Sequence, residues 1–255
     1  MAAKKSEHIE VVEFNTGKAE FYLLGRTPII LNRMTEKVKH ILLMPTGKKT
    51  AAEKAVNVKH NPLEEFRNSP YLNTNPKAET FIEHLSTSFK AAIRSAGVDV
   101  PGATKAQLGR LMWVEGEKVP IWGTPRIIMS VVRCADMGRT PDVRTRAIIP
   151  EWAARLTISF VQPKLNIKTI SRLLAAAGLI QGVGDWRPEK GSGTYGQFEV
   201  VAKDDPRLLS VMKNGRKKQE LAMANPVPYD RESEELITWF NTEAEHRGLK
   251  VVGGK

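Results

Sequence analysis

The order in which strand-like and helix-like segments follow one another constrains the fold of this chain more than any single motif. Apolar and β-branched residues predict strands at residues 11–14 and 19–24, and the second continues into the apolar run 29–31. Residues 126–134 are rich in β-branched side chains, and apolar and hydroxyl side chains alternate along residues 155–161. These two segments are therefore predicted to be the middle strands of a sheet.

Two helices are predicted between the strands. Phe81, Leu85, Phe89 and Ile93 recur every fourth residue, which is the spacing of one helical face, and Gly97 is placed to end that helix. Asn166 is the predicted N-cap of the second helix. The apolar face of this second helix consists of Ile167, Ile170, Leu173, Leu174 and Ala177. A last strand follows at residues 197–201.

Written in chain order, these elements give an α+β protein with a βαββαβ core. That order is the ferredoxin-like or RRM-like arrangement, in which two helices cover one face of a four-stranded antiparallel sheet. Residues 1–31 and 77–203 are predicted to form this core. Residues 32–76 are a basic insertion after the first strand, and residues 135–153 a basic finger between the two middle strands. The remaining residues, 204–255, form a C-terminal basic segment and a helix.

The C-terminal segment changes sign along its length. Residues 207–218 contain no acidic side chain, whereas residues 229–246 are acidic and helix-like. In the acidic part, Leu236, Trp239 and Phe240 share one helical face. Two interpretations stay open: a tail that docks on another copy or another protein, and a terminal helix that packs on its own domain.

The composition favours an anionic partner. The formal net charge is +11 and the isoelectric point is near 9.7, which suits nucleic acid or another anionic surface. The lone Cys134 is expected to be a buried small hydrophobe in a reducing compartment. No apolar stretch approaches the roughly 20 residues of a membrane span. A cytoplasmic protein without a membrane partner is therefore expected.

Residues 178–201 combine glycine, cations and aromatic rings in one loop. Glycines remove side-chain bulk and permit positive φ, Arg187 and Lys190 supply charge, and Trp186 and Tyr195 supply flat faces. The glycines are Gly182, Gly184, Gly191, Gly193 and Gly196. This composition favours a loop that binds phosphates and bases over a mobile surface hairpin without a ligand.

Motifs for catalysis are missing from the sequence. It contains no GxxxxGK[ST] phosphate loop, no HExxH, no CxxC pair and no GxSxG elbow. The histidines have no metal-site spacing, so neither a metal nor another cofactor is expected. A metal-independent ribonuclease would need a general base, for which His84 or His40 would serve. The main prediction is a non-catalytic protein.

Two segments carry a resemblance to a known family. Residues 86–97, STSFKAAIRSAG, resemble the serine-containing basic first-helix segment of the RAMP superfamily, and residues 178–201 resemble its glycine-rich loop. The βαββαβ order with two insertions resembles the backbone subunits of CRISPR Cascade-type complexes. Where those subunits carry a thumb, this chain has the shorter residues 135–152, and Asp185 places an acidic group in the loop.

The resemblance implies a protein that binds single-stranded nucleic acid and oligomerises head to tail into a helical filament. A guide-RNA backbone subunit and a RAMP-type metal-independent endoribonuclease are the alternatives within the superfamily. The same design would suit a phage protein that coats single-stranded DNA for recombination. RNA and DNA are not distinguished. The residues expected to contact the strand are Arg26, Arg33, Lys37, Lys48, Lys49, Lys90, Arg94, Arg139, Arg144, Arg146, Gly184, Trp186, Arg187, Lys190 and Tyr195.

Overall fold

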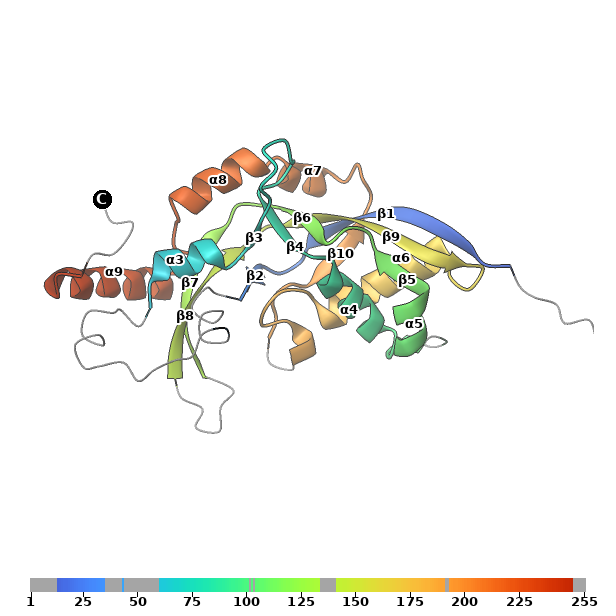
Figure 1. The fold of residues 1–255 in the computed structure, drawn as a ribbon, viewed down its shortest axis with the longest axis horizontal. Helices are drawn as coiled ribbons and strands as arrows, with labels where there is room; N and C mark the ends of the chain where they lie inside the picture. The colour runs from blue at the N-terminus through green and yellow to red at the C-terminus, as the bar shows by residue number, and fades with distance from the viewer. Residues whose placement is uncertain are drawn as a thin grey trace, which may run out of the picture.

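The protein is an α+β molecule, as the element pattern predicted. The computed structural model describes residues 13–34, 43, 60–100, 102, 104–133, 141–190 and 193–249. In these residues a seven-stranded sheet and a three-stranded sheet form the framework, and helices lie on both faces of the larger sheet (Figure 1).

The larger sheet has the order β10-β1-β9-β6-β4-β3, and the short strand β5 also pairs with β9. Every pairing in it is antiparallel. The long central pair of β1 and β9 runs in register from Asn15 opposite Gln162 to Leu24 opposite Ala153. The strands are β1 (Asn15–Gly25), β3 (Tyr71–Leu72), β4 (Ile82–Leu85), β5 (Met112–Val114), β6 (Lys118–Trp122), β9 (Ala153–Gln162) and β10 (Phe198–Val201).

Alternation along β1 gives the larger sheet two different faces. Phe21 and Leu23 point into the main core, which lies between the sheet and the helices α4 (Ser86–Ala96) and α6 (Ile167–Ala176). The helix α5 (Lys105–Leu111) adjoins α4, and a π-helical turn, η1 (Ala177–Gln181), continues α6.

Tyr22 and Leu24 point to the opposite face, where they form a second apolar cluster with Leu208 and Val211 of α7 (Pro206–Met212). The helix α8 (Arg216–Ala224) follows α7 on this side (Figure 1). The face opposite α4 and α6 is therefore partly covered, because C-terminal helices pack on it.

The smaller sheet has the order β2-β8-β7, with β2 (Ile29–Leu31), β7 (Arg126–Arg133) and β8 (Pro141–Ile149). The helices α3 (Pro62–Asn68) and α9 (Arg231–His246) lie beside it. The chain before α9 extends the edge of β7, since the Tyr229 N–H donates to the Ile127 carbonyl at 2.9 Å. The Ser233 hydroxyl accepts from the Met129 N–H at 3.0 Å and so fixes the start of α9 to β7.

The sequence analysis assigned one strand to the wrong sheet. Residues 126–133 form β7 of the smaller sheet, and β5 and β6 take the predicted place beside β9. The sequence concealed this because three consecutive residues of β7, Ile127, Ile128 and Met129, are all buried, as in a strand covered on both faces. In the described part of the predicted finger, residues 141–153, Pro141–Ile149 form the strand β8, whose first four residues are exposed or half-buried and whose last five are buried.

The two predicted helices differ in accuracy. The first was expected from Phe81, but Ile82–Leu85 form β4 and the helix begins at Ser86, because Ile82 and His84 alternate inward as strand residues. In the second, Asn166 caps α6 by accepting from the Thr169 N–H at 2.9 Å, which confirms the predicted start. Its predicted face is buried except at Ile167, which is 56% exposed.

The N-terminal predictions are partly tested. Residues 11 and 12 lie outside the described residues, and residues 13 and 14 are not in a strand, so β1 is the strand found where two were predicted. The predicted continuation at residues 29–31 is a separate strand, β2, of the smaller sheet. The described end of the predicted insertion 32–76 contains α3 and β3. No helix in the described ranges is both long enough and apolar enough to cross a membrane.

Candidate nucleic-acid interface

The glycine-rich loop folds closely onto its own chain. Gly184 has a φ of 84°, and a Cβ there would lie 2.6 Å from the Ile30 carbonyl oxygen. The next residue, Asp185, donates its N–H to the same carbonyl at 2.9 Å. A Cβ at Gly193 would lie 1.6 Å from the Trp186 carbonyl oxygen. The sequence predicted that the backbone of this loop approaches something closely. At these positions it approaches β2 and another part of the same loop.

Trp186 and Arg146 join this loop to the smaller sheet. Arg146 on β8 is 2% exposed, forms an ion pair with Asp185, and lies 4.4 Å from the centroid of the Trp186 ring. Burial lowers the pKa of the Arg146 guanidinium, and the charge of Asp185 acts in the opposite direction. The Trp186 and Tyr195 rings, with centroids 6.0 Å apart, pack on a small apolar cluster of β2, β7 and β8. The Arg146 side chain is thus buried inside the fold, and its charge is paired there with Asp185.

The other side of the loop borders a cleft. Arg187 donates to the Gly184 carbonyl at 2.9 Å and forms an ion pair with Glu189 at 2.6 Å. The cleft has a volume of about 180 Å³ and lies between this loop and the start of α4. Its lining includes Thr87, Ser88, Gly182, Gly184 and Arg187.

The start of α4 is suited to an anion in that cleft. No side chain caps this helix, and the Ser86 N–H donates to the Glu117 carbonyl at 3.0 Å. The following amides of the first turn have no acceptor within a regular helix, because they precede the first complete i to i−4 hydrogen bond. Amides at a helix N-terminus bind phosphate readily. The Thr87 and Ser88 hydroxyls line the same cleft.

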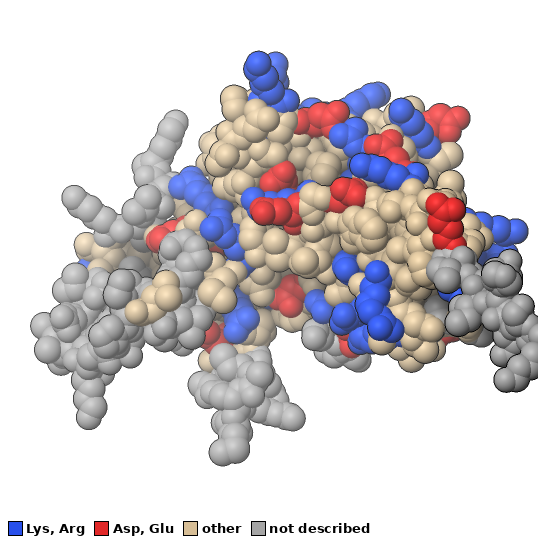
Figure 2. Space-filling model, turned by 45° about the vertical axis from the view of Figure 1, so that its right-hand side comes forward, with Lys and Arg blue, Asp and Glu red and all other residues tan. Residues whose placement is uncertain are grey.

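A layer of uncompensated cations adjoins the cleft. The helices α4, α5 and α6 contain no Asp or Glu. Figure 2 shows Lys and Arg side chains gathered low on one face of the molecule, with both signs mixed above them. No ion pair links a cation of these helices to another described residue. This basic helix layer consists of Lys90, Arg94, Lys105, Arg110, Lys168 and Arg172.

Close packing brings two helices of the layer together. A Cβ at Gly109 of α5 would lie 3.1 Å from Cδ of Arg94, so the stem of Arg94 crosses α5 at a glycine. Arg94 and Arg110 are both exposed, and Lys90 is half-buried. The sequence analysis selected Lys90 and Arg94 but missed the cations of α5 and α6. The missed signal is the absence of carboxylates from three neighbouring helices.

The other predicted residues are dispersed. Arg33 lies over the Tyr71 ring at 5.5 Å, Arg144 is exposed on β8, and Arg26 is exposed after β1. The structure therefore places Gly184 and Arg187 at the cleft, and Lys90 and Arg94 on α4, whose first residues also line that cleft. Four predicted residues lie outside the described residues, as does the side chain of a fifth: Lys37, Lys48, Lys49 and Arg139, and Lys190.

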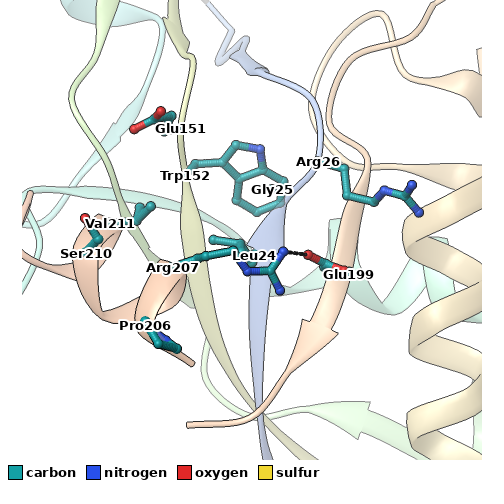
Figure 3. Close-up of a pocket in the computed structure, with 10 residues that line it drawn as sticks. All are labelled: Leu24, Gly25, Arg26, Glu151, Trp152, Glu199, Pro206, Arg207, Ser210 and Val211. Atoms are coloured by element: carbon teal, nitrogen blue, oxygen red, sulfur yellow. Dashed lines mark hydrogen bonds and ion pairs between the residues drawn. The ribbon is translucent and has the colours of Figure 1, made fainter. Parts of the chain in front are cut away.

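Arg26 borders a larger groove of mixed charge. This groove, of about 850 Å³, lies between β1, β10 and α7 (Figure 3). Arg207 in it is paired with Glu199 and with Asp205, both at 2.8 Å, and the Arg26 side chain is directed away from that cluster. Because Glu151 and Glu199 also line the groove, its charges largely offset one another. It suits a phosphate chain less well than the basic helix layer.

The histidine considered as a general base is inaccessible. His84 on β4 is 8% exposed and its Nε2 has no hydrogen-bond partner, and burial lowers its pKa to about 4. His40 lies outside the described residues. Within the described part of the chain, no group of three or more His, Cys, Asp and Glu side chains is placed to hold a metal ion.

Comparisons with known proteins return little. No protein-family model matches this chain, and no curated protein matches it. Among solved structures, the crystal structure of Cmr6 from Pyrococcus furiosus is similar with a TM-score of 0.36 and 8% sequence identity. The match covers 73% of this chain and 99% of that one. At this level of similarity, functional reasoning depends on the geometry of the chain itself.

Proposed function

We propose that this protein binds single-stranded RNA along the basic helix layer and the adjoining cleft, without cleaving it. The observation that carries the proposal is the charge of that layer: its cations have no carboxylate on their own helices and no ion pair among the described residues. Surface cations of a folded protein are usually interspersed with carboxylates. A layer of one sign is the electrostatic footprint expected of a polyanion site.

Two kinds of contact are available to the strand. Lys90, Arg94 and Arg110 neutralise phosphates along α4 and α5, with release of counterions. In the cleft, the first-turn amides of α4 and the Thr87 and Ser88 hydroxyls donate to one phosphate. Arg187 adds less charge than its position implies, because Glu189 is already paired with it.

The sequence supports RNA as the strand. The order β10-β1-β9-β6, with α4 and α6 on one face, supports an RRM-like core. Because the RRM itself binds RNA on the sheet face opposite its helices, the proposed contact on the helix side differs from the RRM mode, and the choice of RNA comes from the sequence. The segments that resemble the RAMP superfamily, residues 86–97 and 178–201, border the cleft from its two sides. The proposed function is accordingly that of a CRISPR-type RNA-binding backbone subunit, with no part in cleavage.

The test is a binding titration with a charge-matched control. Lys90→Glu combined with Arg94→Glu is expected to weaken binding of a labelled single-stranded RNA by at least about 100-fold, because two phosphate partners become repulsive. The control is Lys77→Glu combined with Lys203→Glu, which changes the net charge equally at exposed sites away from α4. Equal weakening by both double variants would show that only net charge matters and would refute the assigned site.

Two further readouts accompany the titration. Single-stranded DNA of the same sequence is expected to bind less tightly than RNA, and tighter binding of DNA would refute the choice of strand. The RNA is expected to remain intact during incubation. Cleavage that is lost with His84→Ala or His40→Ala would favour the alternative, a metal-independent endoribonuclease.

A further inference from the structure

One face of α8 is left uncovered by the rest of the described chain. The buried side chains of this helix, Gln219 and Met223, point into the molecule. Lys218, Leu221 and Ala222 follow one another at the i, i+3 and i+4 positions and so share a different face. Leu221 on that face is 65% exposed. Figure 1 places α8 on the far side of the molecule from α4 and α5, so this face is separate from the proposed RNA contacts.

A groove with an apolar lining lies beside this face. It has a volume of about 570 Å³ and is bounded by α8 and by residues 124–126 and 225–227, and we call it the α8 groove. Leu221 and Val227 both line it, and Val227 is 59% exposed. Single exposed apolar side chains are common on protein surfaces, whereas an exposed apolar patch marks an interaction site. Two such side chains in one groove form a small patch of this kind.

The charged side chains that line the α8 groove are all cations. They are Arg126 and Lys218, and no Asp or Glu is among the described residues of the lining. Arg126 is exposed and has no ion pair with another described residue, and Lys218 donates to the Asn214 side chain at 2.8 Å. The carboxylate of α8, Glu220, is paired with Arg216 at 2.8 Å. A partner that carries carboxylates beside apolar side chains therefore complements this groove.

Nucleic acid fits the α8 groove less well than a protein does. A phosphate chain would pair with the two cations but would leave Leu221 and Val227 in water. No aromatic ring is among the described residues that line the groove, so bases have no ring on which to stack.

The edge beside the groove is unsuited to pairing with a further β-strand. The segment after α8 runs along β7, because the Ile127 N–H donates to the Val227 carbonyl at 3.0 Å and the Tyr229 N–H donates to the Ile127 carbonyl at 2.9 Å. Alternate residues of an extended segment direct their backbone groups to opposite sides, so Pro226 and Pro228 face outward. Proline has no N–H to donate to an added strand. A helix needs no such hydrogen bonds.

The acidic helix of this chain lacks the apolar side chains that the groove requires. Leu236, Ile237 and Phe240 are half-buried in the fold of their own copy, and Trp239 is the one exposed large apolar side chain of α9. Two of the α9 carboxylates are also paired with neighbouring arginines. A helix of another protein therefore fits the groove better than a second copy.

We propose that the α8 groove binds an acidic amphipathic helix of another protein. The apolar side chains of that helix pack on Leu221 and Val227, and its carboxylates pair with Arg126 and Lys218. The contact is small for a protein interface, so a dissociation constant of about 10 to 100 µM is expected. This binding is independent of the proposed RNA contacts.

The test is fluorescence anisotropy of the full chain with a labelled helical peptide of about 18 residues, in which leucines recur at i, i+3, i+4 and i+7 and glutamates flank them. Leu221→Asp is expected to weaken binding at least about 10-fold, because it replaces an apolar contact with a like charge. The control is Leu209→Asp, at a leucine of α7 that is 48% exposed and does not line the groove. Both melting temperatures should stay unchanged. Equal weakening by the two variants would overturn the proposal.

Reversed charges test the ion pairs. Arg126→Glu combined with Lys218→Glu is expected to lose the acidic peptide and to bind a version with lysines in place of the glutamates. The Lys77→Glu, Lys203→Glu variant has the same net charge and is expected to keep the acidic peptide and to ignore the basic one. A basic peptide that binds neither variant, or both equally, would contradict the pairing.

Two results would assign the groove to a different occupant and so overturn the proposal. Self-association of the unmodified chain that is lost with Leu221→Asp would place a second copy there. Displacement of the bound peptide by single-stranded RNA would make the groove part of the RNA site. Leu221→Asp is expected to leave RNA affinity within about twofold, so the RNA proposal and this one fail separately.

Discussion

Gln219 shows how one side chain joins elements that are distant in sequence. It lies on α8 and is fully buried. Its side-chain oxygen accepts from the N–H groups of Phe81 and Ile82 at 2.8 and 3.0 Å. Its amide nitrogen donates to the carbonyls of Ile121 and Gly123 at 2.7 and 3.0 Å. A single amide thus ties α8 to β4 and to the end of β6.

Replacing this amide is expected to be costly. Gln219→Leu keeps a similar volume but removes the partner of four backbone groups, three of them in buried hydrogen bonds, and each buried unsatisfied group costs about 1 to 3 kcal/mol. A loss of at least about 3 kcal/mol in the free energy of unfolding is expected in urea titrations. Lys217→Leu, at an exposed neighbouring position, is the control. A loss below 1 kcal/mol for Gln219→Leu would contradict the assigned role.

His60 is a second connecting residue, and its effect depends on pH. Its Nδ1 lies 2.8 Å from Glu65 of α3 and its Nε2 lies 3.0 Å from Asp142 of β8. The hydrogen bond to Glu65 is the largest influence that raises the pKa of His60, the charges of both carboxylates add to it, and burial opposes it. The charged imidazole therefore stabilises the contact between α3 and β8.

The sign of this pH dependence follows from the raised pKa. The stabilisation is fully present below the unfolded-state value of about 6.5 and is lost as the pH rises through the folded-state pKa. His60→Gln removes the titrating group. The stability difference between the unmodified chain and this variant is expected to be largest at about pH 5.5 and to shrink toward pH 8.5 in urea titrations. A difference that grows with pH would contradict the interpretation.

At the scale of elements, the sequence predicted best where one residue type decides the local structure. The Asn166 cap and the alternation along β9 each act through neighbours in the chain, so they were visible in the sequence. The partner of β7 could not be predicted from the sequence, because tertiary packing decides that β7 pairs with β8 and not with β9. The bend at residues 115–117 also made β5 and β6 hard to predict, because it divides the segment that pairs with β9 into two short strands.

The candidate site was only partly predictable for a related reason. Composition marked Arg146 as a surface cation, but the fold buries it against Asp185, a residue 39 positions away. Conversely, the sequence analysis did not select Lys105 and Arg172, because each lies in a short amphipathic segment. Their shared location became clear only when α4 was seen to contact both α5 and α6.

The Trp186→Ala variant tests whether the ring of this loop serves the stability of the fold or the binding of RNA. Trp186→Ala removes the ring that lies over Arg146 and leaves a gap beside Tyr195. A loss of about 1 to 3 kcal/mol in stability is expected from the lost cation–π contact and apolar burial. RNA affinity per folded molecule is expected to stay within about threefold. Melting temperature and affinity are measured on the same preparation, and a selective loss of affinity would instead indicate base stacking on this ring.

At the scale of the whole molecule, charge is segregated although the net charge is strongly positive. The formal charge of +11 is not spread evenly: α4, α5 and α6 are purely basic, the groove beside α7 is mixed, and α9 is acidic. The side formed by α4 and α5 is therefore the one on which the proposed RNA contact depends.

The salt dependence of RNA binding tests the central claim most directly. For a single strand, the logarithm of affinity falls with the logarithm of salt concentration by about 0.7 per neutralised phosphate. The slope is expected to be shallower by about 1.4 in the Lys90→Ala, Arg94→Ala double variant than in the unmodified chain, because two phosphate contacts are lost. An unchanged slope in this variant would contradict the account, since the basic helix layer would then not touch the strand.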